Sequence, residues 1–210
     1  MFDAHIRPFI DPPLNQLGLK LARSGVTANA VTVAGFIVGM TAVPLILIES
    51  YVLAAIVVAT SRLADGLDGA VARATQKTDL GGFLDISLDF LFYGAVPLAF
   101  AIINPEANAL ACAILLMSFF ANGTTFLAFA IMAEKRGIET SAQGTKSLYY
   151  LSGLAEGFET IVFLIAICIV PSYFAWLAYI YAAICFGSAI GRIAIAAQTL
   201  DRDTTPTPSD

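Results

Sequence analysis

Histidine is almost absent from this 210-residue chain, and cysteine is scarce and scattered. His5 is the single histidine, which argues against zinc sites and excludes a Ser-His-Asp triad in practice. The three cysteines, Cys112, Cys168 and Cys185, lie far apart inside apolar runs, without CxxC spacing. We interpret them as buried packing residues. Any catalytic chemistry must therefore use other side chains.

Charge is also scarce. Only 13% of the residues are charged, 58% are hydrophobic, and the mean hydropathy is +0.80, which is outside the range of soluble globular proteins. Basic patches with interleaved aromatic residues are missing, and the pI is about 4.7. Nucleic acid is therefore not expected as a partner. The lipid bilayer is expected as a partner, because the apolar runs reach the roughly 20 residues that are needed to span it.

The apolar segments predict an all-α integral membrane protein with six transmembrane helices. The expected spans are about 30–48, 51–64, 82–103, 107–133, 148–170 and 173–197. Three regions follow: a cytoplasmic segment over 1–29, a six-helix catalytic domain over 30–198, and a disordered cytoplasmic tail over 199–210. A short amphipathic helix after Pro13 is expected to lie on the membrane surface. The spacing Gly35-x-x-x-Gly39, repeated at Gly153 and Gly187, permits close helix contact.

The basic residues predict the orientation. With six spans, all 11 lysines and arginines fall on the side of the two termini, and the opposite turns carry none. Loops rich in Lys and Arg stay in the cytoplasm. The termini are therefore expected to be cytoplasmic, and in a bacterium the membrane would be the inner one.

Five aspartates fall within the 25 residues from Asp65 to Asp89, between two apolar runs. Asp65 and Asp68 share a face at the end of the second span, and Asp85 and Asp89 share a face at the start of the third. A short turn joins these helices, so the two pairs can face each other. Asp79 lies in the turn and is expected to be a bystander.

Four converging carboxylates repel one another, and in a partly dry site they need cations. Hard divalent ions with oxygen ligands, Mg²⁺ or Mn²⁺, fit better than zinc or copper. Two such ions would suit a phosphoryl-type displacement. The alternative is a purely structural set of ion pairs with Arg62, Arg73 and Lys77.

The stretch D-G-L-D-G-A-V-A-R from Asp65 to Arg73, followed by Gly81, Asp85 and Asp89, resembles a family signature. It is the signature D-x-x-D-G-x-x-A-R, spacer, G-x-x-x-D-x-x-x-D of the class I CDP-alcohol phosphotransferases, also called CDP-alcohol phosphatidyltransferases. The spacer here is one residue shorter than the family's usual one. The change leaves both aspartate pairs intact and leaves open whether Gly81 or Gly82 takes the role of the family glycine.

The resemblance implies a phospholipid-synthesising transferase. Such an enzyme moves a phosphatidyl group from CDP-diacylglycerol to the hydroxyl of a small polar alcohol and releases CMP. It implies metal ligands at Asp65, Asp68, Asp85 and Asp89, with Asp89 also the general base. It implies nucleotide contacts at Asp68, Gly69 and Arg73, with Asn29 as a weaker candidate. A homodimer is implied as well.

The acceptor alcohol stays open. Lys135, Arg136 and Lys146 can hold an acceptor phosphate, which favours a polyol phosphate such as glycerol 3-phosphate or inositol phosphate; their other role is to set topology. Glu156 and Glu159 favour serine or another amino alcohol, or they pair with a neighbouring cation. A membrane prenyltransferase would carry two acidic clusters, and a divalent-cation transporter would distribute its acids along a pathway. Both fit less well.

Overall fold

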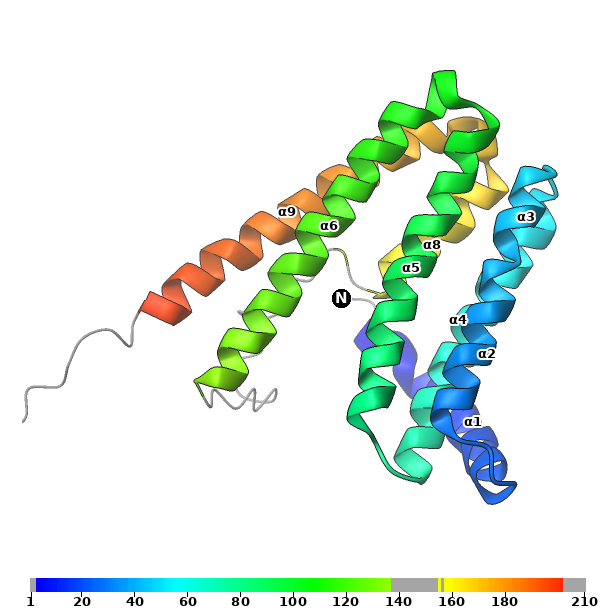
Figure 1. Ribbon diagram of the computed structural model, residues 1–210, viewed down its shortest axis with the longest axis vertical. Coiled ribbons are helices and arrows are strands. Elements are labelled where there is room, and N and C mark those ends of the chain that lie inside the picture. The colour runs from blue at the N-terminus through cyan, green and yellow to red at the C-terminus, as the bar shows by residue number, and fades with distance from the viewer. Residues whose placement is uncertain (1–2, 137–154, 156, 202–210) are drawn as a thin grey trace, which may run out of the picture. The chain divides into compact units, whose positions relative to one another are not determined.

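The computed structural model describes residues 3–136, 155 and 157–201, and every regular element within them is helical (Figure 1). This confirms the all-α class. The elements are α1 Asp3–Arg23, α2 Ala28–Met40, α3 Ala42–Leu47, α4 Tyr51–Ala74, α5 Asp79–Ile103, α6 Pro105–Lys135, α8 Gly157–Ile169, the 3₁₀ turn η1 Pro171–Tyr173 and α9 Phe174–Asp201.

Four stretches of the described residues are long and apolar enough to cross a bilayer: 28–47, 79–103, 105–135 and 171–200. The first joins α2 and α3 across Thr41. α4 has the length, but it carries Arg62, Asp65, Asp68 and Arg73. The described part of α8 is shorter than a span. The protein is thus a helical membrane protein, and the count of six spans stays a prediction.

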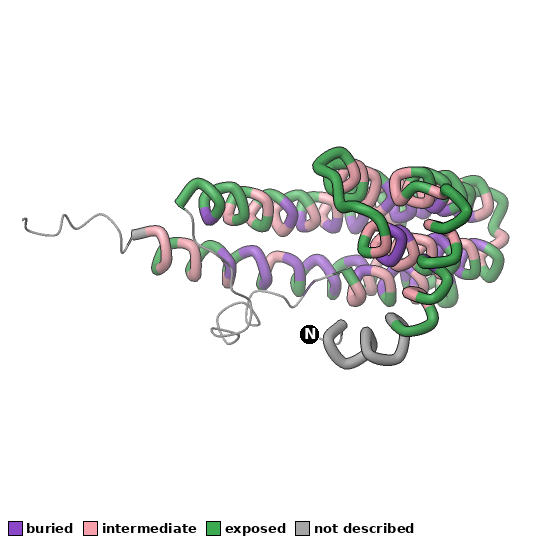
Figure 2. The backbone as a smooth tube through the Cα atoms, turned by 90° about the horizontal axis from the view of Figure 1, so that it is seen from below, coloured by how far each residue is buried: buried purple, intermediate pink, exposed green. Residues whose placement is uncertain are grey.

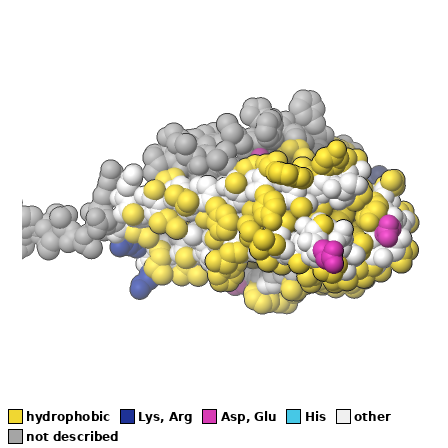
Figure 3. All heavy atoms as spheres, turned by 90° about the horizontal axis from the view of Figure 1, so that it is seen from above, with side chains coloured by type: hydrophobic (Ala, Val, Ile, Leu, Met, Phe, Trp, Pro, Cys, Tyr) yellow, Lys and Arg dark blue, Asp and Glu magenta, His cyan; other side chains and the backbone are white. Residues whose placement is uncertain are grey.

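Large apolar side chains are exposed on most helices, including Ile48, Val52 and Trp176 at more than 70%. The face drawn in Figure 3 is largely hydrophobic, with few charged side chains. A surface of this kind suits a protein surrounded by lipid.

The helices fall into two compact units. The N-terminal unit comprises residues 2–112 and 157–177, and the C-terminal unit comprises residues 113–156 and 178–210. The tail predicted to be disordered lies outside the described residues, apart from 199–201 at the end of α9. Where burial is described, buried residues along the helices are interspersed with intermediate and exposed ones (Figure 2).

Glycines bring α2 against α4 in the N-terminal unit. A Cβ atom at Gly35 would lie 2.9 Å from Ala64 Cβ, and one at Gly39 would lie 2.4 Å from Ser61 Oγ. The close contact predicted for this glycine pair is therefore present, and it lies within the chain. Among the described residues nothing lies within 4 Å of a Cβ built on Gly157 or Gly187, and Gly153 lies outside the described residues, so close contact at these two spacings stays a prediction.

Aromatic residues fill the rest of this core. Phe100 of α5 stacks on Tyr51 at 5.9 Å and on Phe174 at 4.9 Å between ring centroids. Phe92, which lies beside the candidate site, is also fully buried. These stacks tie the end of α5 to the start of α4 and to Phe174.

α1 begins at Asp3, so the prediction that it starts after Pro13 is wrong. Proline removes a backbone donor, but its fixed φ is compatible with a helix, and packing can hold the helix together. Here α1 packs on α4: a Cβ at Gly18 would lie 2.8 Å from the backbone of Ala70. Leu17 and Leu19 remain exposed. A position on the membrane surface stays a prediction.

In the C-terminal unit, α9 is tied to α6 by a buried arginine. Arg192 donates to the backbone oxygen of Asn122 at 2.8 Å and to its side-chain Oδ1 at 3.0 Å, and it reaches Thr125 Oγ1 at 3.1 Å. Ser188 accepts from the backbone N–H of Ala155 at 3.0 Å.

Candidate active site

The turn between α4 and α5 fixes where α5 begins. α4 ends at Ala74, and α5 begins at Asp79 with Thr78 as its N-cap, whose hydroxyl oxygen accepts from the backbone N–H of Gly81 at 3.1 Å. Such a cap fixes the first turn of a helix. The short turn thus joins the end of α4 to the start of α5, while along its length α5 packs mainly on α2 and α3.

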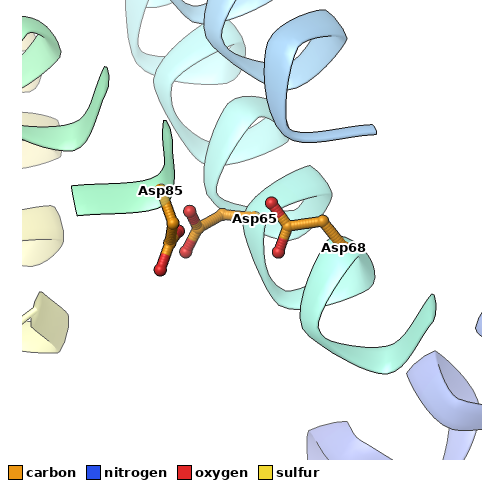
Figure 4. Close-up of side chains that lie close together, drawn as sticks. All are labelled: Asp65, Asp68 and Asp85. Carbon is orange, nitrogen blue, oxygen red and sulfur yellow. The ribbon is translucent and has the colours of Figure 1, made fainter. Parts of the chain in front are cut away.

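Three of the four predicted aspartates converge. Asp65 and Asp68 of α4 and Asp85 of α5 each offer one carboxylate oxygen, and these oxygens all lie within 4.8 Å of one another (Figure 4). Asp68 is buried, Asp65 is half-buried and Asp85 is exposed. Asp79 lies outside the group.

The chemistry of these donors fits a hard divalent cation. Thr32 of α2 approaches the Asp68 carboxylate, but the buried Oδ2 of Asp68 has no hydrogen-bond partner in the described part of the chain. A buried carboxylate oxygen without a partner is costly unless a cation or donor completes it. A cavity of about 10 Å³ lies beside Asp65, Asp85 and Asp89, which is room for a guest the size of a water molecule.

Asp89 is not one of the three converging acids and has its own partners. Arg62 of α4 forms an ion pair with Asp89 Oδ1, and the Tyr93 hydroxyl donates to Asp89 Oδ2 at 2.9 Å. The same Arg62 nitrogen lies 3.7 Å from Asp65 Oδ1. One cation thus partly compensates two of the acids, which is part of the structural alternative drawn from the sequence.

The other two cations of that alternative do not pair with the acids among the described residues. The Arg73 guanidinium contacts Asn15 Oδ1 of α1, through Nε at 3.3 Å and Nη2 at 2.9 Å. Lys77 forms no ion pair within the described part. Arg62 alone cannot neutralise four carboxylates, so the described part of the chain leaves most of the negative charge of the site uncompensated.

Of the predicted nucleotide residues, Asn29 lies on α2, and Asp68, Gly69 and Arg73 lie on α4. A Cβ on Gly69 would meet only Arg73 Nη1, at 3.4 Å. A Cβ on Gly81 would lie 2.9 Å from Asn29 Oδ1, whereas one on Gly82 would have nothing within 4 Å. The short spacer left open whether Gly81 or Gly82 takes the role of the family glycine. Gly81 is the one whose surroundings exclude a side chain.

The predicted acceptor residues are only partly described. Glu159 is half-buried in the first turn of α8, in the N-terminal unit. Lys135 ends α6 and Arg136 follows it, and both are exposed in the C-terminal unit. Glu156 and Lys146 lie outside the described residues.

Three residues of the site are absent from the sequence-based set. Tyr93 lies four residues after Asp89 on one helical face, a spacing that could have revealed it. Thr32 and Asn15 come from other helices, and no local pattern points to them.

Comparison with known proteins agrees with this geometry. The chain matches the CDP-alcohol phosphatidyltransferase family over residues 25–195. It belongs to this family and is a transferase, which confirms the resemblance. Because enzymes of the family transfer a group from a CDP-linked alcohol to an alcohol acceptor, the class of reaction is settled as well.

Individual relatives extend the comparison. Inner membrane protein YnjF of Escherichia coli is 46% identical over 193 residues, which cover 92% of this chain and 94% of the relative. An archaetidylinositol phosphate synthase of Pyrococcus horikoshii is 41% identical over 87 residues, 41% of this chain and 46% of the relative. One from Methanothermobacter thermautotrophicus is 31% identical over 162 residues, 77% of this chain and 72% of the relative. No solved structure matches the chain.

Proposed function

We propose that this transferase moves a phosphatidyl group from CDP-diacylglycerol to a polyol phosphate and releases CMP. The convergence of Asp65, Asp68 and Asp85 beside an oriented Asp89 is the observation that carries the proposal. Two relatives are named archaetidylinositol phosphate synthases, which supports an inositol phosphate or a similar acceptor. The uneven distribution of Lys and Arg supports a cytoplasmic site and cytoplasmic termini.

The carboxylates would hold Mg²⁺ or Mn²⁺, and we propose two ions. Asp65, Asp68 and Asp85 are the ligand set, and Asp89 is a further ligand as well as the base. Bound there, divalent cations neutralise the pyrophosphate and stabilise the attacking and leaving oxygens. The unpartnered Oδ2 of Asp68 supports this assignment.

The chain itself would bind the donor and move one proton. Gly69 leaves open space beside Arg73, so a cytidine nucleotide can approach the backbone of α4 with its phosphates near the guanidinium. Asn29 is a further nucleotide contact in this proposal. The donor's acyl chains would stay in the bilayer.

Asp89 takes the proton from the acceptor hydroxyl. The acceptor oxygen then forms a bond to the phosphorus that carries the diacylglycerol. The bond from that phosphorus to the bridging oxygen of CMP breaks, and CMP leaves with the electron pair. The products are a phosphatidyl-polyol phosphate and CMP.

Lys135 and Arg136, together with Lys146, are proposed to hold the acceptor phosphate. The half-buried Glu159 favours the second candidate, an amino alcohol such as serine. Glu156 would act with it. A homodimer is also proposed from the family resemblance, and ultracentrifugation in detergent would test it.

An acceptor panel tests the proposal. The purified protein, in micelles with CDP-diacylglycerol and Mg²⁺ or Mn²⁺, is given inositol phosphate, glycerol 3-phosphate, inositol or serine, and CMP release is measured. We expect release with the phosphates, none with Asp89→Asn, and a melting temperature raised by metal with CDP-diacylglycerol but not with prenyl diphosphates. Release with serine alone would favour the amino alcohol, and undiminished turnover by Asp89→Asn would remove Asp89 as base.

A further inference from the structure

Both carboxylate oxygens of Asp89 have a partner inside the protein. Arg62 pairs with Oδ1, and the Tyr93 hydroxyl donates to Oδ2 at 2.9 Å. Arg62 also reaches the Tyr93 oxygen at 3.5 Å, which closes a triangle of three side chains from α4 and α5. Two fixed contacts restrict the rotation of the carboxylate about its last bond.

Arg62 is itself held on several sides, and its side chain is only 7% exposed. Its guanidinium carbon lies 4.7 Å from the centre of the Phe92 ring and 5.6 Å from that of Tyr93. Arg62 Nη2 donates to Ser61 Oγ at 3.2 Å, and Ser61 Oγ donates to the backbone oxygen of Gly35 at 2.9 Å. Arg62 is thereby anchored to α2 as well as to α5.

These contacts leave the Asp89 carboxylate able to accept further hydrogen bonds. An ionised carboxylate has about four lone-pair positions, and the two contacts use only two of them. Asp89 is also 23% exposed, so the remaining positions can be reached from the site. The arrangement fixes the direction of the carboxylate without blocking it.

We propose that Arg62 and Tyr93 are positioning residues that aim the Asp89 carboxylate at the acceptor hydroxyl. The inference rests on the role of Asp89 as base in the proposed function. It goes beyond that function because the two residues act through Asp89 and touch neither substrate.

Compensation of charge alone does not account for the geometry. A neutral hydroxyl on Oδ2 adds no charge, yet Tyr93 makes that contact. A flat guanidinium stacked on an aromatic ring and hydrogen-bonded in its plane has a defined orientation, which an ammonium group lacks. Orientation, more than the mere presence of a cation, is what these residues add.

Three variants test the inference by steady-state CMP release. Arg62→Met should lower kcat about 100-fold, the size of effect that a misplaced catalytic group causes. Tyr93→Phe should lower kcat about tenfold, as expected for the loss of one hydrogen bond to a charged group. Arg62→Lys should stay about tenfold below the wild type, because lysine keeps the charge but not the planar fork. In each variant KM should change less than about threefold, since ground-state binding is untouched.

Mn²⁺ binding, measured by electron paramagnetic resonance without donor or acceptor, separates positioning from damage to the other carboxylates. We expect the affinity of Tyr93→Phe and Arg62→Lys to stay within about threefold of the wild type. Arg62→Met should bind Mn²⁺ at least as tightly as the wild type, because it removes a cation that lies 3.7 Å from Asp65 and leaves every carboxylate in place. Matched controls are Arg23→Met and Tyr179→Phe, at exposed positions outside the site, which should keep wild-type kinetics. Should Arg62→Met fail to fold, Arg62→Lys and Tyr93→Phe carry the test.

Wild-type kcat in Tyr93→Phe or Arg62→Lys would overturn the positioning role, and so would a collapse of Mn²⁺ affinity that parallels kcat. Failure of the proposed function looks different. In that case the wild-type protein releases no CMP with any acceptor, or Asp89→Asn retains full turnover. If the wild type is active, Asp89→Asn is inactive and the positioning variants keep wild-type kinetics, only this inference is wrong and the proposed function stands.

Discussion

The two ends of the aspartate site are built differently. We call Ser61, Arg62, Asp89 and Tyr93 the packed end, and Asp68, Gly69, Arg73 and Asp85 the open end. At the packed end each acid oxygen of Asp89 has a partner, and Ser61 is fully buried between α2 and α4. At the open end Asp68 keeps an oxygen without a partner in the described chain, and Asp85 is exposed.

This difference indicates which part of the chemistry the chain completes by itself. The packed end is finished by protein groups, so in the proposed function the base would be oriented before any substrate binds. The open end has carboxylate oxygens and free space that only an added cation and a nucleotide would fill. Catalysis with a preorganised base and ligands that arrive from outside requires this division.

The largest effect is expected from removing an acid of the open end. Asp85→Asn should lower CMP release about 1000-fold, because metal ions supply several kcal/mol of stabilisation to the transition state and each 1.36 kcal/mol is tenfold in rate. Mn²⁺ binding should weaken as well. Asp79→Asn, six residues earlier in the first turn of α5, is the matched control and should behave as the wild type. Equal losses in both variants would break the distinction between a site acid and a bystander.

A second effect, on stability, belongs to the packed end. In Gly39→Ala the new methyl group would lie 2.4 Å from Ser61 Oγ and 3.0 Å from Phe92 Cε2, so α2 and α4 must separate. Overpacking of this kind costs about 1–3 kcal/mol. In Gly82→Ala, three residues before Asp85 of the open end, the new methyl group meets nothing within 4 Å, and stability should stay within about 0.5 kcal/mol of the wild type. Thermal unfolding in detergent measures both, and an equally destabilised Gly82→Ala would contradict the comparison.

Sequence reasoning located the open end better than the packed end, and the reason is distance along the chain. Asp65 and Asp68 are three residues apart, so one helix places them on one face whatever else the protein does. Arg62 and Asp89 are 27 residues apart. Their meeting depends on the rotation of α4 relative to α5, which buried contacts such as Phe92 set and which no local pattern records.

The helices show the same limit. The apolar runs predicted α5 and α6 closely, because hydropathy and length are local properties. The start of α1 was misjudged because proline was treated as a stop, whereas the contact of Gly18 with α4 supports a longer helix. α4 shows the conflict most directly: the acids that make the site also lower the hydropathy by which a span is recognised.

The smallest effect should come from the contact between α1 and the open end. Asn15 Oδ1 accepts two hydrogen bonds from Arg73, which is exposed, so Asn15→Ala removes a contact worth about 0.5–1.5 kcal/mol. If Arg73 binds the nucleotide, KM for CDP-diacylglycerol should rise about two- to tenfold by the same energy, with kcat unchanged. Gln16→Ala, the neighbouring exposed residue, is the control. A fall in kcat at constant KM would instead place Arg73 with the reacting groups.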